Sequence, residues 1–166
     1  LNRAPGLVIT DSQVFADVDK IVPENLLLTS FSILFARYKG DLGQTCRGVK
    51  ALKTLEDGDR ILISEGCTHH RQCGDIGTEK LPAWIREFTG KEPEFVFTSG
   101  TEFPEDLSGF HLIIHCGGCM LNERGMKYRL RMAVDQNIPM TNYGVAIAYM
   151  TGILERSVRP FITLIS

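Results

Sequence analysis

Cysteine and histidine side chains gather at two points of the chain, and each point directly follows a short apolar run. The first is Cys67-Thr68-His69, and the second is His115-Cys116-Gly117-Gly118-Cys119. Thiolate sulfur is a soft anionic donor, so this set of side chains selects zinc, copper or an iron–sulfur cluster over magnesium or calcium. The glycines of the second motif let the backbone wrap closely and aim N–H groups at sulfur, which an anionic cluster needs more than a zinc ion does. The sequence therefore predicts a metal site.

Three cysteines, Cys67, Cys116 and Cys119, leave one corner of a tetrahedral site or of a cubane cluster to another donor. The candidates for this fourth donor are His69, His70, Cys73, Asp75 and His115. For zinc, an open fourth position indicates catalysis and a closed one indicates a structural site. Spacing alone does not choose between zinc, an iron–sulfur cluster and a redox dithiol. His115 can equally be a strand-end histidine that hydrogen-bonds to the backbone, and His111 is expected to be structural.

The elements that must position these residues follow from the hydrophobic pattern. Short apolar runs typical of strands alternate with amphipathic stripes typical of helices. The expected strands span 60–64, 94–98, 110–114 and 138–141, and the expected helices span 81–88, 121–135 and 144–154. Strands that alternate with helices pair in parallel through right-handed crossovers. The sequence predicts an α/β fold, a layered domain with a mostly parallel sheet flanked by helices.

Both cysteine motifs leave their strands at the same edge of that sheet. Cys67 follows the 60–64 strand, and Cys116 follows the 110–114 strand. Sites in open α/β sheets form beyond the carboxyl ends of the strands. If these two strands are neighbours, the strand spacing of about 4.8 Å brings Cys67 within reach of the other pair. The helix that follows Cys119 favours thiolate through its N-terminal dipole.

A smaller α/β segment precedes this domain. It contains expected strands at 7–10 and 26–29 and an apolar helix at 31–38. Glycines around residue 40 interrupt the pattern, so we expect a boundary between residues 1–40 and residues 41–166. The first part is too small to hold a core alone. Its apolar side chains should pack on the rest of the chain, on absent sequence or on a second subunit.

Composition and charge narrow the classes of function. Hydrophobic residues make up 43% of the 166 residues, charged residues make up 23%, and the net charge is −2. A globular protein that does not bind nucleic acid is expected. The basic stretch of Arg124, Lys127, Arg129 and Arg131 is expected to form a solvated helix face. No apolar run approaches the roughly 20 residues needed to cross a bilayer, so no membrane association is expected.

The cysteine count suggests a compartment. The chain has 5 cysteines and no secretory signal. We therefore expect no disulfide framework, and we expect the protein to be in the reducing cytoplasm. Cys46 lies on an amphipathic stripe and is expected to be a core thiol. The chain begins at Leu1 without an initiator methionine, so we expect it to be a piece of a longer polypeptide.

The motifs resemble those of the hydrogenase maturation protein family HydF. The resemblance rests on residues 7–15, 28–32 and 39–42, and on Glu65-Gly66-Cys67-Thr68-His69-His70 with His115-Cys116-Gly117-Gly118-Cys119-Met120. It implies that residues 1–40 are the C-terminal part of a dimerisation domain and that residues 41–166 are an iron–sulfur cluster-binding domain.

The resemblance also implies a function for the site. It implies a [4Fe–4S] cluster on Cys67, Cys116 and Cys119, with an exchangeable fourth ligand for which His69, His115 and Asp75 are the candidates. The family is described as a scaffold that carries a di-iron precursor of the H-cluster and delivers it to [FeFe]-hydrogenase. The implied partners are a second copy of the chain in a homodimer or a higher oligomer, the hydrogenase, and the radical-SAM maturases HydE and HydG.

The sequence departs from the family in one respect. No Gly-x-x-x-x-Gly-Lys-[Ser/Thr] motif occurs, so the phosphate cradle of the family's GTPase domain is absent and no enzyme activity is expected of this chain. Two alternatives remain beside the scaffold. One is a structural zinc-binding interaction module, and the other is a cluster-dependent hydro-lyase that uses the open iron as a Lewis acid.

Overall fold

The computed structural model describes residues 5–66 and 76–162. In the labels used below, η1 and η2 are short 3-10 helices and η3 is a π-helix. The elements in chain order are β1 (Leu7–Thr10), η1 (Ser12–Val14), α1 (Phe15–Ile21), β2 (Leu27–Ser30), α2 (Phe31–Lys39), α3 (Leu42–Gly48), η2 (Val49–Thr54), β3 (Arg60–Ser64), η3 (Ile76–Lys80), α4 (Leu81–Thr89), β4 (Glu94–Thr98), β5 (Leu112–His115), α5 (Glu123–Asp135), β6 (Met140–Asn142), α6 (Tyr143–Met150) and α7 (Leu154–Ile162).

The larger sheet has the strand order β4-β3-β5-β6, and every neighbouring pair is parallel. Its central strands are continuous apolar runs that are almost completely buried, as in Ile61-Leu62-Ile63 of β3. Such runs are typical of parallel strands because helices cover both faces of the sheet. The predicted α/β fold with a mostly parallel sheet is therefore confirmed.

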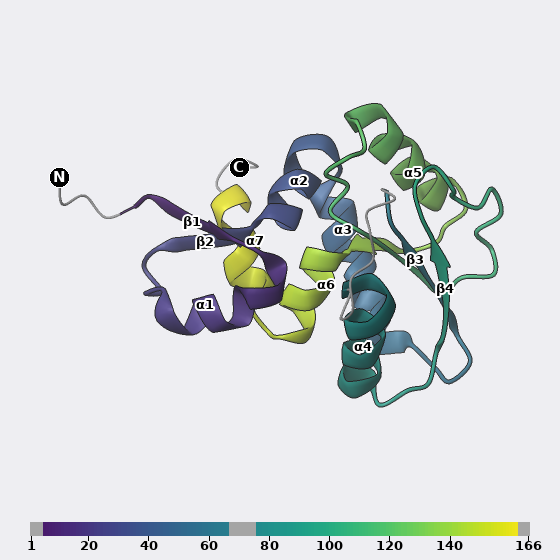
Figure 1. Cartoon of the computed structure of the whole chain (residues 1–166), viewed down its shortest axis with the longest axis horizontal. Helices are drawn as coiled ribbons and strands as arrows, with labels where there is room; N and C mark the ends of the chain where they lie inside the picture. The colour runs from purple at the N-terminus through teal and green to yellow at the C-terminus, as the bar shows by residue number, and fades with distance from the viewer. Residues whose placement is uncertain (1–4, 67–75, 163–166) are drawn as a thin grey trace.

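Helices cover both faces of this sheet. Ile61 and Ile63 face a core shared with α4, α6 and η2, whereas Leu62 and Ile113 face a second core shared with α5. The alternation follows from strand geometry, since successive side chains point to opposite faces. In Figure 1, α5 lies on the far side of the larger sheet from α6. The loops after β3 and β5 therefore emerge at a sheet edge that is flanked by helices on two sides.

The smaller sheet is formed by β1 and β2, which pair in parallel, and it lies at the other end of the molecule (Figure 1). Helix α7 packs on β2, and Arg156 of α7 donates to the Asp19 carboxylate at 2.7 Å. The last helix therefore returns to the first strands. Helix α2 packs on α6 with Ile33 and Ala36 buried, but Phe31 and Tyr38 on its other side are exposed.

Several element boundaries differ from the sequence-based expectation, and three of these differences affect the packing. The strand expected at 110–114 is shifted to Leu112–His115, so that His115 belongs to β5 itself. The stripe that starts at Leu42 is divided at Gly48, where an added Cβ would lie 2.1 Å from the carbonyl oxygen of Met140. The helix expected to run to residue 154 ends at Met150, and Gly152, with φ of +80°, separates it from α7.

Candidate metal centre

The strands that precede the two cysteine motifs are direct neighbours. Ser64 of β3 pairs with His115 of β5, and the backbone N–H of Cys116 donates to the carbonyl oxygen of Ser64 at 2.9 Å. The two strands are therefore neighbours, which is the condition under which Cys67 would come within reach of the other pair. Cys67, His69, His70, Cys73 and Asp75 themselves lie outside the described residues.

The Cys116 sulfur accepts hydrogen bonds from two backbone N–H groups. Gly66 donates to Sγ at 3.1 Å, and Gly118 donates to it at 3.3 Å. Both positions require glycine. A Cβ on Gly66 would lie 2.7 Å from Leu121, and Gly118 has φ of +66° with Met126 only 2.3 Å from the place of a Cβ. The loop therefore directs partial positive charge at this sulfur, as a thiolate ligand requires.

Cys119 lies on the exposed side of the same loop. It is followed by Asn122, whose Oδ1 accepts from the Gly125 N–H at 2.8 Å and caps α5. Lys39, at the end of α2, donates to the carbonyl oxygens of Cys119 and Leu121 at 3.1 Å and 2.8 Å. The position of the loop thus depends on a buried cation from the N-terminal segment, and no local sequence pattern predicts this contact.

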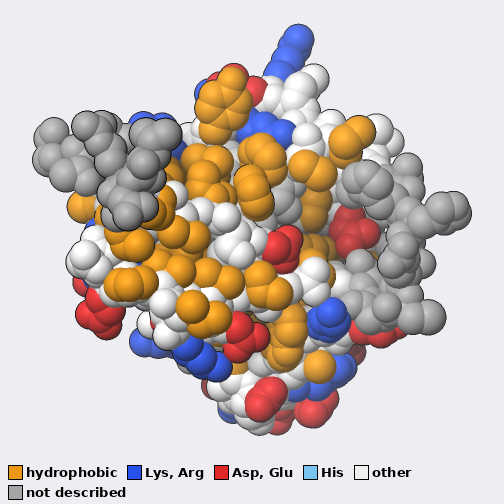
Figure 2. Space-filling model, turned by 60° about the vertical axis from the view of Figure 1, so that its left-hand side comes forward, with side chains coloured by type: hydrophobic (Ala, Val, Ile, Leu, Met, Phe, Trp, Pro, Cys, Tyr) orange, Lys and Arg blue, Asp and Glu red, His pale blue; other side chains and the backbone are white. Residues whose placement is uncertain are grey.

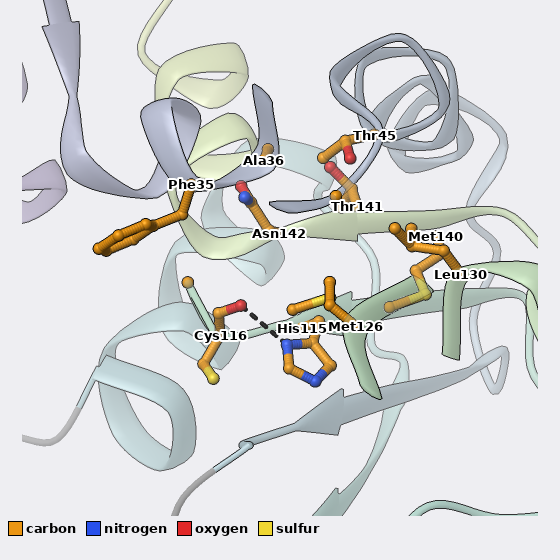
Figure 3. Close-up of a pocket in the computed structure, with 12 residues that line it drawn as sticks. Phe35, Ala36, Thr45, His115, Cys116, Met126, Leu130, Met140, Thr141 and Asn142 are labelled. Atoms are coloured by element: carbon orange, nitrogen blue, oxygen red, sulfur yellow. Dashed lines mark hydrogen bonds between the residues drawn. The ribbon is translucent and has the colours of Figure 1, made fainter. Parts of the chain in front are cut away.

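His115 is 1% exposed, and both of its ring nitrogens have partners. Nδ1 lies 2.8 Å from the carbonyl oxygen of Cys116 (Figure 3). Nε2 lies 2.9 Å from Nη1 of Arg129. A guanidinium can only donate, so Nε2 is the acceptor and Nδ1–H is the donor. Burial, opposed by the bond to Cys116 and helped by the Arg129 charge, lowers the pKa of His115 to about 4.

Arg129 is a member of this site that the sequence interpretation missed. The expectation of a solvated face holds for Arg124, Lys127 and Arg131, which are exposed, but it is wrong for Arg129, which is 4% exposed. A signal was present in the spacing, because Arg129 follows the buried Met126 by three positions on the same helix face. A residue on the buried side of an amphipathic helix is directed inward whatever its charge.

A small cavity of about 20 Å³ lies behind the cysteine loop. It is lined mainly by apolar side chains, including Phe35, Met126 and Met140, together with Cys116 and Thr141 (Figure 3). This volume suits one water molecule at most. The cavity is therefore too small for a metal cluster, and Cys119 is exposed to solvent.

Cys46 lies apart from the cysteine loop, against the core of the molecule. Cys46 is half-buried and packs against the main core, and burial raises the pKa of its thiol. It therefore behaves as the core thiol that the sequence predicts. Among residues 5–66 and 76–162, no group of three or more His, Cys, Asp or Glu side chains is arranged to hold a metal ion. The described part of the chain contains Cys116 and Cys119, and the whole predicted ligand set stays a prediction.

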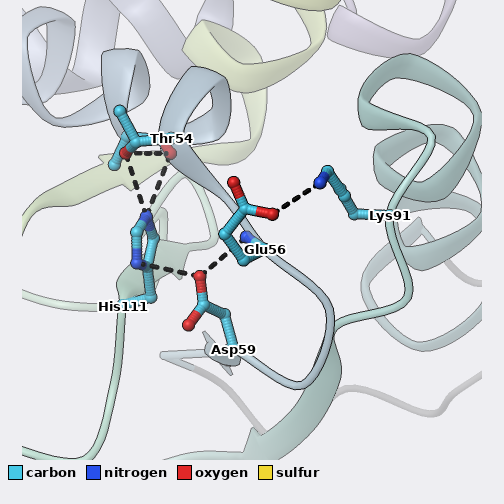
Figure 4. Close-up of polar contacts among 6 residues, drawn as sticks. Thr54, Glu56, Asp59, Lys91 and His111 are labelled. Atoms are coloured by element: carbon cyan, nitrogen blue, oxygen red, sulfur yellow. Dashed lines mark hydrogen bonds and ion pairs between the residues drawn. The ribbon is translucent and has the colours of Figure 1, made fainter.

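His111 lies at the opposite end of β5 and has a structural role. Its Nδ1 is 3.1 Å from the Asp59 carboxylate, and its Nε2 is 3.1 Å from the carbonyl oxygen of Ala51 and 3.2 Å from Oγ1 of Thr54 (Figure 4). The same Asp59 oxygen accepts from the N–H of Glu56 at 2.8 Å. These contacts tie the loop before β3 to the start of β5, far from the cysteines.

Comparisons with known proteins place the chain among proteins that assemble with themselves. Residues 1–40 match the family model of the hydrogen maturase F dimerization domain, and residues 43–160 match that of the hydrogen maturase F tetramerization domain. These matches define a self-associating protein that acts in hydrogenase maturation. Because the second match alone covers more than half of the chain, the chain belongs to the hydrogen maturase F (HydF) family. The comparison with curated proteins gave no match.

The lengths and the hydrophobicity of the helices bear on membrane insertion. Within residues 5–66 and 76–162, none of them combines the length and the apolar character that crossing a bilayer requires.

Proposed function

We propose that this chain is an iron–sulfur scaffold in [FeFe]-hydrogenase maturation, working in the cytoplasm. In this proposal Cys67, Cys116 and Cys119 bind a [4Fe–4S] cluster, and the fourth iron takes an exchangeable ligand. Three thiolates leave one iron open, and an open position suits a carrier because the cargo must be released. The cargo is a di-iron precursor of the H-cluster, received from the radical-SAM maturases HydE and HydG and delivered to the hydrogenase.

The observation that carries this proposal is the pair of N–H groups directed at the Cys116 sulfur. One comes from Gly118 in the same loop, and the other comes from Gly66, which directly precedes Cys67 in the sequence. Hydrogen bonds to ligand sulfur stabilise the negative charge of a cluster and tune its potential. Soft thiolate donors at the ends of adjacent strands therefore fit an iron–sulfur cluster.

The chain's own residues hold and expose the site in this proposal. When bound, the cluster supplies an iron with an open coordination position and one-electron redox chemistry. Cys116 anchors it from the inner side of the loop and Cys119 from the outer side. Lys39 fixes the loop through the carbonyl oxygens of Cys119 and Leu121. No residue of the chain is assigned a catalytic step.

The N-terminal part supplies the surface for self-association in this proposal. Figure 2 shows apolar side chains gathered over the face that comes forward when the β1–β2 end is turned toward the viewer. Among the described residues of this part, the exposed large apolar side chains are Ile9, Val14, Ile21, Leu27, Phe31 and Tyr38. A two-stranded sheet is too small to be stable alone and leaves strand edges open for pairing. A second copy of the chain accounts for both features.

Anaerobic reconstitution with iron and sulfide tests the cluster. We expect roughly four irons and four sulfides per chain, with an EPR signal in the reduced form. Cys116→Ser should lose most of the iron, whereas Cys46→Ser, a matched substitution in the core, should keep it. Unchanged iron in Cys116→Ser would remove Cys116 as a ligand. Stoichiometric zinc without visible absorption would replace the scaffold with the structural zinc module.

A further inference from the structure

Arg129 is a buried cation with an unusual set of partners. Its Nη1 donates to Nε2 of His115 at 2.9 Å and to Oγ of Ser64 at 3.3 Å, and its Nη2 donates to the carbonyl oxygen of Gly100 at 2.7 Å. Its guanidinium lies 4.9 Å from the centre of the Phe103 ring. The guanidinium thus donates three hydrogen bonds to these partners, and none of the acceptors is a carboxylate.

A neutral set of partners leaves the charge of Arg129 unbalanced. Within residues 5–66 and 76–162, no carboxylate forms an ion pair with Arg129. Burying a cation without a counter-ion is costly, so buried charges in proteins are normally paired. Burial lowers the pKa of Arg129, and a charge on the Cys116 sulfur opposes that shift. The missing counter-charge therefore belongs on the cysteine side of His115.

We propose that Arg129 is the built-in counter-charge of the anionic cluster and that His115 is a positioning residue between them, not the fourth ligand of the cluster. This inference rests on the proposed function, since it assumes an iron–sulfur cluster on Cys116. It adds that the exchangeable ligand comes from elsewhere. It also assigns the tuning of the cluster's redox state to a residue on α5.

The hydrogen bonds of His115 support the second half of this proposal. Coordination requires a free lone pair on a ring nitrogen. The lone pair of Nε2 accepts from Arg129, and Nδ1 carries the proton donated to the carbonyl oxygen of Cys116. To bind iron through Nε2, His115 would have to release Arg129 and leave the guanidinium without that acceptor. As a bridge, it instead fixes the backbone of Cys116.

The charge of Arg129 has a measurable consequence for the cluster. Each electron that enters the cluster adds one negative charge, so a nearby buried cation stabilises the reduced form more than the oxidised form. At the applied potential that half-reduces the cluster of the unaltered protein, Arg129→Gln should lower the ratio of reduced to oxidised cluster by about tenfold. Arg129→Lys, which keeps the charge, should restore a ratio close to that of the unaltered protein.

Redox titration of the reconstituted full chain, followed by EPR, measures this ratio. Arg131→Gln is the matched control, because it removes the same charge from the same helix at a side chain that is 83% exposed. It should leave the ratio unchanged, since solvent screens it. If Arg129→Gln does not fold, Arg129→Met keeps the apolar stem of the side chain and is measured instead. A ratio that is unchanged in Arg129→Gln, or lowered equally in Arg131→Gln, overturns the counter-charge.

Pulsed EPR of the reduced cluster tests the role of His115. A strong nitrogen coupling that is present in the unaltered protein and lost in His115→Gln identifies His115 as a ligand and overturns the proposal. A coupling that is absent from both proteins, or retained in the variant, supports the positioning role. The iron and sulfide content of the unaltered protein is measured first. Absence of a cluster is a failure of the proposed function, whereas a bound cluster indifferent to Arg129 is a failure of this inference alone.

Discussion

Two histidines mark the two ends of strand β5, and they differ in the charge of the groups that they contact. His111 directly precedes the strand, and His115 is its last residue. His111, at the start, is partly exposed and faces the Asp59 carboxylate, so a positive charge on its ring has a negative partner. His115, at the end, is buried and faces the Arg129 guanidinium. The polar network at the start of the strand is balanced by the chain itself. The network at the end leaves a net positive charge beside two cysteines.

This difference indicates which end of the sheet has a function. A structural polar network needs only to satisfy its own hydrogen bonds and charges. A ligand site can leave a charge unsatisfied, because the ligand completes it. Both networks are fully hydrogen-bonded around their histidines, so a count of hydrogen bonds does not distinguish them. The two networks differ in whether their charges are balanced by other residues of the chain.

The largest expected contrast is in the stability of the metal-free protein. His115→Ala should lower the free energy of unfolding by about 3 kcal/mol, because it leaves a buried cation without its acceptor and opens a cavity. His111→Ala should cost about 1 kcal/mol, since water can replace the partners of a partly exposed ring. Urea unfolding at neutral pH measures both values. Equal losses in the two variants would contradict the distinction between the two ends.

The second prediction concerns pH. Burial and the Arg129 charge lower the pKa of His115 from 6.5 to about 4. Between these two pH values, His115 is protonated in the unfolded chain and neutral in the folded protein. The stability from this residue is complete above the unfolded pKa and falls as the pH drops from 6.5 toward 4. The total loss is roughly 3 kcal/mol, and no more is lost below that window.

Variants isolate this pH effect from the titration of carboxylates. The stability advantage of the unaltered metal-free protein over His115→Gln should narrow steadily between pH 6.5 and pH 4.5 in urea unfolding. The difference between the unaltered protein and Arg131→Gln should show no such trend, because that side chain is exposed and stays charged over the range. A constant difference for His115→Gln would show that His115 takes up its proton at the same pH in the folded and the unfolded protein, and it would contradict the lowered pKa.

The sequence was sufficient where local pattern decides structure. The apolar runs of β3, β4 and β5 were predictable because their burial is visible as a run of neighbouring apolar residues. The adjacency of β3 and β5 was expected only as a condition for the site. Helix α7 was missed, since its buried residues Ser157 and Phe161 face β2, whose place beside it is set by the tertiary fold.

The cysteines and the histidine of the candidate site could be predicted from the sequence, whereas the cationic side chains that contact them could not. Cysteine and histidine are residue types that commonly bind metals, so Cys116, Cys119 and His115 could be named as candidates from the sequence. Lys39 and Arg129 could not be assigned in the same way, because lysine and arginine are mostly solvated. Their contacts to the loop join residues far apart in the chain. The partners of these two side chains therefore emerge only from the packing, although the spacing to Met126 already indicated that Arg129 is buried.

The smallest expected effect lies at the balanced end of β5. Asp59→Asn should lower stability by less than about 1 kcal/mol, because the pair of Asp59 with His111 is partly exposed and an amide can still accept the Glu56 N–H. The loss should shrink further in high salt. Iron content and the ratio of reduced to oxidised cluster should match those of the unaltered protein. A change in either cluster property would show that the two ends of the strand are coupled, and charge balance could then no longer be assigned to each end separately.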